Sequence, residues 1–190
     1  GIRLEEIRKV SRDGTSPTLL ERTINDKKSI RIPMHLTGGG PGNRTCTSEY
    51  KIHVVRKWQR QNGSSRENPA VCGLGISVDE IQRARTESGF PDQTLEYPLI
   101  DMGLRRTDCH NIIKKGGLPP APRSSCWFCP FHNKEEWRRL KRNHPDLFEK
   151  TVQLEKLLGD RREELGKDRS HMTRFNKPLD QVIDLSLIHI

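Results

Sequence analysis

Two cysteines separated by two residues, Cys126 and Cys129, constrain this chain more than any other feature. Their spacing places two thiols on one tight turn, which is the commonest half-site for a tetrahedral zinc ion or an iron–sulfur cluster. A proline-rich segment (118–122) precedes the pair and a predicted helix start follows it, so both flanks restrict the loop. We therefore favour a metal site, and expect Trp127 or Phe128 to pack inward and shield it.

Three other interpretations of the pair compete with metal binding. A redox pair of the thioredoxin type would open a helix directly after a strand, whereas this pair follows a proline-rich loop. A disulfide is disfavoured because the chain has five cysteines, an odd number, without the layout of a small secreted scaffold. A reducing cytoplasm is the expected compartment. Two buried thiols beside Trp127 and Phe128 are the third alternative.

Composition and charge narrow the class of protein. The 190 residues suffice for one ordinary domain, but only 32% are hydrophobic and 31% are charged, so the core must be concentrated in a few segments. The sequence has no run of about 18 apolar residues, which predicts no membrane span. A net charge of +9 favours polyanionic partners, namely nucleotides, sulfate esters or nucleic acid. We rank nucleotides above nucleic acid because the sequence contains no recognisable nucleic-acid module.

Helical and strand patterns alternate along the chain. Strands are predicted over 29–36, 70–77 and 95–100, and the second is continuously apolar, as in a strand buried on both faces. Helices are predicted from Ser16-Pro17, over 46–60, between Thr107 and Gly116, from Asn133 and from Pro145. This order predicts an α/β fold with a helical C-terminal end. The glycine-rich stretch 37–43 lacks a Gly-Lys-Ser/Thr ending, which favours a mobile loop over a phosphate cradle.

The remaining cysteines extend the predicted metal site. Cys72 lies in the middle of a predicted strand and is explained as a small buried apolar residue. Cys46 lies at the N-terminal edge of a predicted helix, where the helix dipole favours the thiolate. The candidate ligands are then Cys46, Cys109, Cys126 and Cys129. Four thiolates suffice for a [4Fe–4S] cluster or zinc, and their long separations suit a site gathered from distant parts of one α/β domain.

Three motifs give the chain a family resemblance. Arg-Thr-Cys-Thr-Ser-Glu-Tyr-Lys-Ile (44–52), Gly-Ile-Ser-Val-Asp-Glu (75–80) and Cys-Trp-Phe-Cys-Pro (126–130) occur in the order seen in the phosphoadenosine-phosphosulfate (PAPS) reductase-like family. That family belongs to the adenine-nucleotide α-hydrolase-like, or PP-loop, superfamily. The resemblance covers about residues 44–182 and implies a Rossmann-like layer that binds ATP or an adenylyl-sulfate-like nucleotide. Cys46 and Lys51 match the family's first cysteine and lysine, while Thr47 replaces the second cysteine, for which Cys109 is the candidate substitute.

The resemblance also implies nucleotide contacts. Lys51 and Arg44 would stabilise phosphate or sulfate charge. A backbone approach to the nucleotide is expected at Gly73, Gly75 and Ser77. Two family motifs are absent from the sequence, the Ser-Gly-Gly-x-Asp-Ser phosphate loop and the Glu-Cys-Gly-x-His motif that carries the reductase cysteine. We therefore assign no catalytic residue, and expect an N-terminally truncated piece of an enzyme that is inactive by itself.

The expected organisation has three parts. Residues 1–144 would form the C-terminal part of the nucleotide-binding domain, including the cysteine site. Residues 145–183 would form a helical tail whose end, over 159–169, is charged and exposed, and residues 184–190 are expected to be non-native. The expected function is adenylyl or sulfur transfer by a cytoplasmic protein with a four-cysteine site. The alternative is a non-catalytic, zinc-stabilised module that binds DNA.

Overall fold

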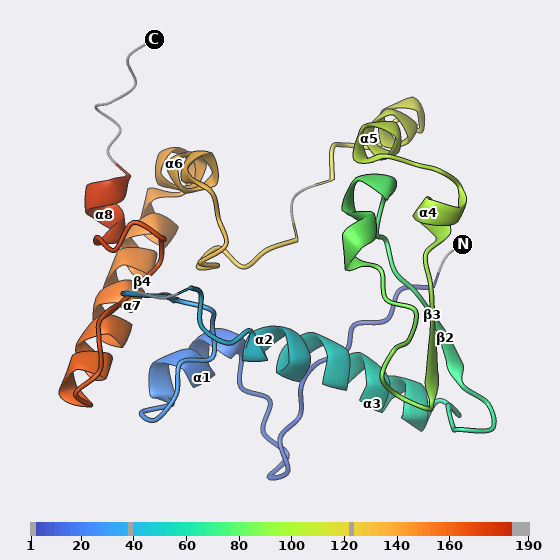
Figure 1. The fold of residues 1–190 in the computed structure, drawn as a ribbon, viewed down its shortest axis with the longest axis horizontal. Coiled ribbons are helices and arrows are strands. Elements are labelled where there is room, and N and C mark those ends of the chain that lie inside the picture. The colour runs from blue at the N-terminus through green and yellow to red at the C-terminus, as the bar shows by residue number, and fades with distance from the viewer. Residues whose placement is uncertain (1–2, 38–39, 122–123, 184–190) are drawn as a thin grey trace. The chain divides into compact units, whose positions relative to one another are not determined.

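The computed structural model describes residues 3–37, 40–121 and 124–183. It is mixed α/β and forms two compact units, the first made of residues 1–52 and 125–190 and the second of residues 53–124 (Figure 1). This division differs from the expected boundary at residue 144, because the two ends of the chain share one core. The residues expected to be non-native lie outside the described ones. Within the described ranges, no helix is long and apolar enough to span a membrane.

The first unit is mainly helical. Its strands β1 and β4 pair antiparallel, with His35 opposite His171. Its helix α7 packs against α6, β4, α1 and α8. The elements of this unit are α1 (Leu19–Asn25), β1 (His35–Leu36), α2 (Thr45–Thr47), the π-helical turn η1 (Ser48–Ile52), α6 (Lys134–Asn143), α7 (Pro145–Glu164), β4 (Ser170–His171) and α8 (Leu179–Val182).

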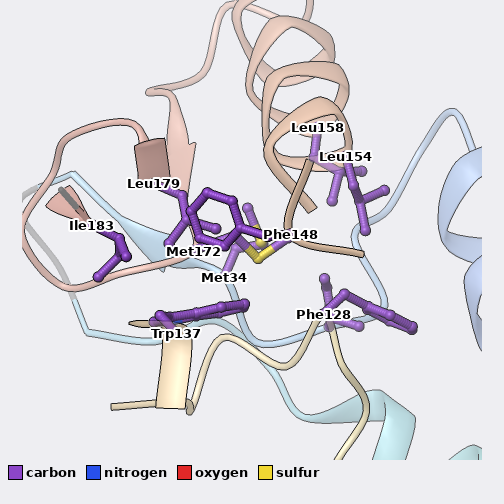
Figure 2. Close-up of a cluster of buried hydrophobic side chains, with 10 residues drawn as sticks. Met34, Phe128, Trp137, Phe148, Leu154, Leu158, Met172, Leu179 and Ile183 are labelled. Atoms are coloured by element: carbon purple, nitrogen blue, oxygen red, sulfur yellow. The ribbon is translucent and has the colours of Figure 1, made fainter. Parts of the chain in front are cut away.

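The core of the first unit gathers segments from both ends of the chain (Figure 2). The fully buried Trp137 of α6 lies in it, and Phe128 reaches it from the turn between the two cysteines. Its buried hydrophobic residues are Ile32, Met34, Phe128, Trp137, Phe148, Leu154, Leu158, Met172, Leu179 and Ile183. The segment expected to be a helical tail therefore supplies much of this core.

Local signals place the helix starts of this unit. Asn133 and Glu136 form the predicted capping box, in which each side chain accepts a hydrogen bond from the other's backbone N–H, at 2.9 and 2.8 Å. Pro145 occupies the first turn of α7, also as predicted. Helix α1 begins at Leu19 rather than near Ser16, because Thr18 and Glu21 form a second reciprocal box.

Helix α7 ends at Glu164, within the expected helical tail, in a defined turn. Gly166, with φ of 66°, reverses the chain after Glu164. Before that end, the buried Gly159 leaves a slot under the side chain of Arg169, whose Cζ would lie 2.8 Å from a Cβ at position 159. Arg169 in turn pairs with Asp160 and Glu163, both at 2.8 Å. A glycine inside this helix is thus explained by packing and not by a bend.

The second unit contains α3 (His53–Gln61), β2 (Ala70–Gly73), the 3-10 helix η2 (Val78–Arg83), β3 (Gln93–Glu96), α4 (Pro98–Asp101) and α5 (Arg106–Lys115). Its two strands pair parallel, with Cys72 opposite Leu95. The predicted helices over 46–60 and between Thr107 and Gly116 are confirmed, the first as α2, η1 and α3 in succession.

The strand predictions are only partly correct. β2 stops at Gly73, and its burial alternates, with Val71 60% exposed, so the prediction of a strand buried on both faces is wrong. The predicted strand over 95–100 gives way to α4, which Pro98 opens, and that over 29–36 is reduced to His35–Leu36. Both sheets that the described residues form have two strands. The mixed α/β class is thus borne out, while the Rossmann-like layer stays a prediction. The predicted mobile loop over 37–43 includes residues 38–39, which lie outside the description.

A buried carboxylate holds the C-terminal segment of the first unit against α7. Glu155 is 3% exposed and accepts hydrogen bonds from the backbone N–H groups of Met172 and Leu179, both at 2.6 Å. Burial raises the pKa of Glu155 despite these two bonds. One side chain therefore satisfies two buried donors that have no helical partner.

We expect Glu155→Ala to lower the free energy of unfolding by about 3 kcal/mol, because it leaves two buried N–H groups without an acceptor. Urea unfolding followed by circular dichroism measures the change. Glu149→Ala, on the exposed side of the same helix, is the matched control and should change stability by less than about 0.5 kcal/mol. Equal losses in the two variants would contradict the role given to Glu155.

Candidate metal centre and its basic neighbours

The segment that carries Cys126 and Cys129 forms two successive hydrogen-bonded turns. The N–H of Cys129 donates to the carbonyl of Cys126, and that of His132 donates to the carbonyl of Cys129, both at 3.0 Å. Between the thiols, Phe128 is 5% exposed and Trp127 packs edge-on against it, with ring centroids 4.8 Å apart. The expectation that one of these aromatics packs inward is confirmed.

Contacts beyond the aromatic rings also anchor this turn. Pro130 is fully buried, and its carbonyl lies 3.2 Å from Nε2 of His35 on β1. Across the turn, Ser125 Oγ and His132 Nε2 are 3.0 Å apart. The backbone that carries the two thiols is therefore held from both sides. The proline-rich segment that precedes it ends in residues 122–123, outside the described ranges.

Cys46 is fixed through the backbone of Arg31. The Cys46 N–H and the Thr45 hydroxyl both donate to the Arg31 carbonyl, at 3.1 and 3.0 Å. The guanidinium of Arg31 is itself held by Asp26 at 2.6 Å and by Glu49 at 2.7 Å. The position of this thiol thus depends on a half-buried network of charges.

Glu49 is the centre of that network. Its carboxylate pairs with Lys9, Arg22 and Arg31. Burial alone would raise the pKa of Glu49, but hydrogen bonding to Lys9 and the charges of the three cations hold it below its usual value. Sequence reasoning did not find this network, because its members are spread over 9–49 with no periodicity that would link them.

The first unit brings together the predicted residues Cys46, Lys51, Cys126 and Cys129. Burial raises the pKa of the Cys126 thiol, the thiols of Cys129 and Cys46 raise it further, and the ammonium of Lys51 lowers it. These three groups therefore lie close enough to Cys126 to act on its charge. Segments 46–51 and 126–129, far apart in the sequence, thus lie within electrostatic range of each other.

Arg44 lies beside the same turn. Its guanidinium stacks over the ring of Phe131, with 5.0 Å between Cζ and the ring centroid. Arg44 and Lys51 are both exposed, so both can reach an anion from solvent. Two cations therefore accompany the three thiols of the first unit.

The other predicted site residues belong to the second unit. Cys109 is half-buried on α5, and Cys72 is half-buried on β2. Gly73 and Gly75 are exposed, and a Cβ at Gly75 would meet no atom within 4 Å. Ser77 is buried; its hydroxyl lies 3.5 Å from Asp79, which accepts the N–H of Arg106 at 2.6 Å. Ser77 thus belongs to the packing of the start of α5.

The thiols of the first unit have the chemistry of a metal site but do not form a complete ligand shell. Among the residues that the structure describes, no three side chains of His, Cys, Asp or Glu are arranged to hold one metal ion. The donor set fits zinc or iron, since both take thiolates. If all three thiolates bound one ion, they would leave one position of a tetrahedral site for a fourth ligand.

Comparison of the chain with protein-family models, with curated proteins and with solved structures gave no match. The family resemblance of the three motifs therefore remains an expectation from the sequence.

Removing the charge of Lys51 should make Cys126 harder to deprotonate. We expect Lys51→Gln to raise the pKa of the Cys126 thiol further and so to slow its alkylation by iodoacetamide at pH 8 in the metal-free protein. Peptide mass spectrometry across a pH series measures the rate at this one cysteine. Lys150→Gln, an exposed lysine on α7, is the control with the same change of charge. If alkylation of Cys126 followed the same pH profile in the two variants, Lys51 would have no specific effect on the pKa of this thiol.

Proposed function

We propose that this chain is part of a nucleotide-binding enzyme of the PAPS reductase-like type. Cys46, Cys109, Cys126 and Cys129 would hold a [4Fe–4S] cluster or a zinc ion, and the reaction would be adenylyl or sulfur transfer. The observation that carries the proposal is the meeting of Cys46, Lys51, Cys126 and Cys129 in one unit, in the electrostatic neighbourhood of a single thiol. Cys109 is proposed as the fourth ligand on the sequence argument.

Electrostatics supports a metal at this place. Burial raises the pKa of the Cys126 thiol, and the neighbouring thiols of Cys129 and Cys46 raise it further, because their negative charge repels that of the thiolate. A bound cation removes that repulsion and keeps the ligands deprotonated, so the cluster of thiols becomes a source of stability. Phe128 and Trp127 would limit access of water to the bound group.

The two cations beside the thiols support a nucleotide. Lys51 and Arg44 could each donate charge-assisted hydrogen bonds to a phosphate or sulfate oxygen. Gly73, Gly75 and Ser77 remain the proposed backbone contacts in the second unit. The proposed ligand is ATP or an adenylyl-sulfate-like nucleotide, and the chain alone is expected to be inactive because it lacks the family's phosphate loop.

A second candidate function is a non-catalytic zinc-stabilised module that binds DNA. The net charge of +9 favours it. A brown colour would favour the first candidate, since an iron–sulfur cluster absorbs visible light and zinc, the metal of the second candidate, does not. Anaerobic purification followed by metal analysis identifies the bound ion.

Metal and fold should be lost together when a ligand is removed. We expect Cys126→Ser and Cys109→Ser to abolish metal binding and to lower the thermal midpoint, because thiolate ligation couples binding to folding. Metal analysis and thermal melts of the full chain measure both. Cys72→Ser is the matched control and should keep the metal. If Cys109→Ser kept the metal, Cys109 would not be a ligand. If Cys126→Ser melted at an unchanged temperature, the metal site would have no structural role.

Nucleotide binding should depend on Lys51. We expect Lys51→Gln to weaken the binding of ATP by about tenfold or more, since a hydrogen bond to a charged group contributes about 1.5–3 kcal/mol. Isothermal titration calorimetry measures the affinity, with Lys150→Gln as the control for charge. Equal affinities for the two variants would count against a phosphate contact at Lys51.

A further inference from the structure

A second basic site lies in the first unit at the C-terminal ends of α1 and α7. A hollow of about 190 Å³ there is lined by five cations, Lys27, Lys28, Arg161, Arg162 and Lys167. No acidic side chain is among its lining residues in the described part of the chain. Concave surfaces that carry charge of one sign concentrate ions of the opposite sign.

Two helix ends fix the backbone around this hollow. At the end of α7, Lys167 N–H donates to the Arg162 carbonyl and Gly166 N–H to the Glu163 carbonyl, both at 2.9 Å. This pair of bonds is a Schellman turn, which requires the positive φ of Gly166 and brings Lys167 back beside Arg162. At the end of α1, the carboxylate of Asp26 accepts the N–H of Lys28 at 3.0 Å.

The two arginines are oriented by backbone carbonyls. The guanidinium of Arg161 donates to the carbonyls of Thr23, Ile24 and Asp26, at 3.1, 2.6 and 2.6 Å. Nε of Arg162 donates to the carbonyl of Asp168 at 2.6 Å. Cations at helix C-termini are a common stabilising feature, so these contacts explain the arginines structurally. Within the described ranges, neither guanidinium forms an ion pair with a carboxylate.

Helix capping does not explain the three lysines. Lys27, Lys28 and Lys167 are exposed, and within the described ranges their ammonium groups make no ion pair or hydrogen bond. Of the acids close to the hollow in sequence, Asp26 pairs with Arg31, and both Asp160 and Glu163 pair with Arg169. Glu164 and Asp168 lie next to lining residues in the sequence, but within the described ranges no ion pair joins them to the three lysines. The charged side chains that line the hollow are therefore all positive.

We propose that this hollow binds phosphate groups of a nucleic-acid backbone. Its volume is below the roughly 300–1,000 Å³ of pockets that enclose a whole small molecule, so it suits one phosphate of a larger molecule that extends along the surface. A phosphodiester backbone presents such groups repeatedly, and the net charge of +9 favours its approach. The proposal rests on residues apart from the metal centre, so it does not depend on the nucleotide-binding enzyme proposed above, and it would give the second candidate, a DNA-binding module, a defined contact site.

The test compares two triple variants of the full chain with the same change of charge. The hollow variant replaces the three lysines that line the hollow by glutamine (Lys27→Gln, Lys28→Gln and Lys167→Gln). The control variant replaces three exposed lysines elsewhere, two of them also at a helix end (Lys114→Gln, Lys115→Gln and Lys150→Gln). Fluorescence anisotropy with a labelled 20-base-pair DNA duplex measures affinity over a series of salt concentrations. Thermal melts that match the unchanged protein confirm that both variants are folded.

We expect the hollow variant to bind DNA at least about tenfold more weakly than the control variant. The slope of log affinity against log salt should fall by about 2, as expected when about two phosphate contacts are lost. Replacing the same three lysines by arginine should retain binding, because the charge is kept. Equal affinities and slopes for the two glutamine variants would overturn the proposal.

Discussion

Phe128 links the candidate metal centre to the stability of the first unit. Its backbone lies between the two thiols of the turn, while its ring is buried in the core beside segments from both ends of the chain. Burial of such a side chain contributes about 1.5–3 kcal/mol. The free energy that packs the core therefore also holds the turn in place. A metal at this turn would act on an element that the core already restrains.

Ion pairs hold Cys46 in place, as core packing holds the turn that carries Cys126 and Cys129. The backbone N–H of Cys46 donates to the carbonyl of Arg31, whose side chain is fixed by Asp26 and Glu49. The thiols are thus positioned by two kinds of force, hydrophobic packing for the turn and ion pairing for Cys46. Salt should loosen the second more than the first, because partly exposed charges are screened and packed rings are not.

The sequence predicted features set by neighbouring residues better than features set by residues far apart in the chain. The capping box of Asn133 and Glu136 and the proline that opens α7 act within one helical turn, and both predictions held. Strand predictions were less successful, because the burial of a strand depends on partners that its own residues do not specify. Val71 belongs to an apolar run and is nevertheless 60% exposed.

Some parts of the candidate site were likewise predicted from the sequence, and others were not. Motif order brought Cys46, Lys51 and the cysteine pair into one hypothesis, and in the first unit the other three act on the charge of Cys126. The network around Glu49 and the basic hollow were not predicted, because each assembles charged residues from distant segments. Such residues look like ordinary solvated charge until the fold places them side by side.

The slot at Gly159 restricts how this protein can diverge. A Cβ at position 159 would lie 2.8 Å from Cζ and Nε of Arg169, so any larger residue there requires the arginine side chain to shift or to be replaced by a shorter one. Shortening Arg169 would in turn leave Asp160 and Glu163 without their shared cation. Across an evolutionary lineage, positions 159 and 169 should therefore vary as a pair, with the two acidic positions following them.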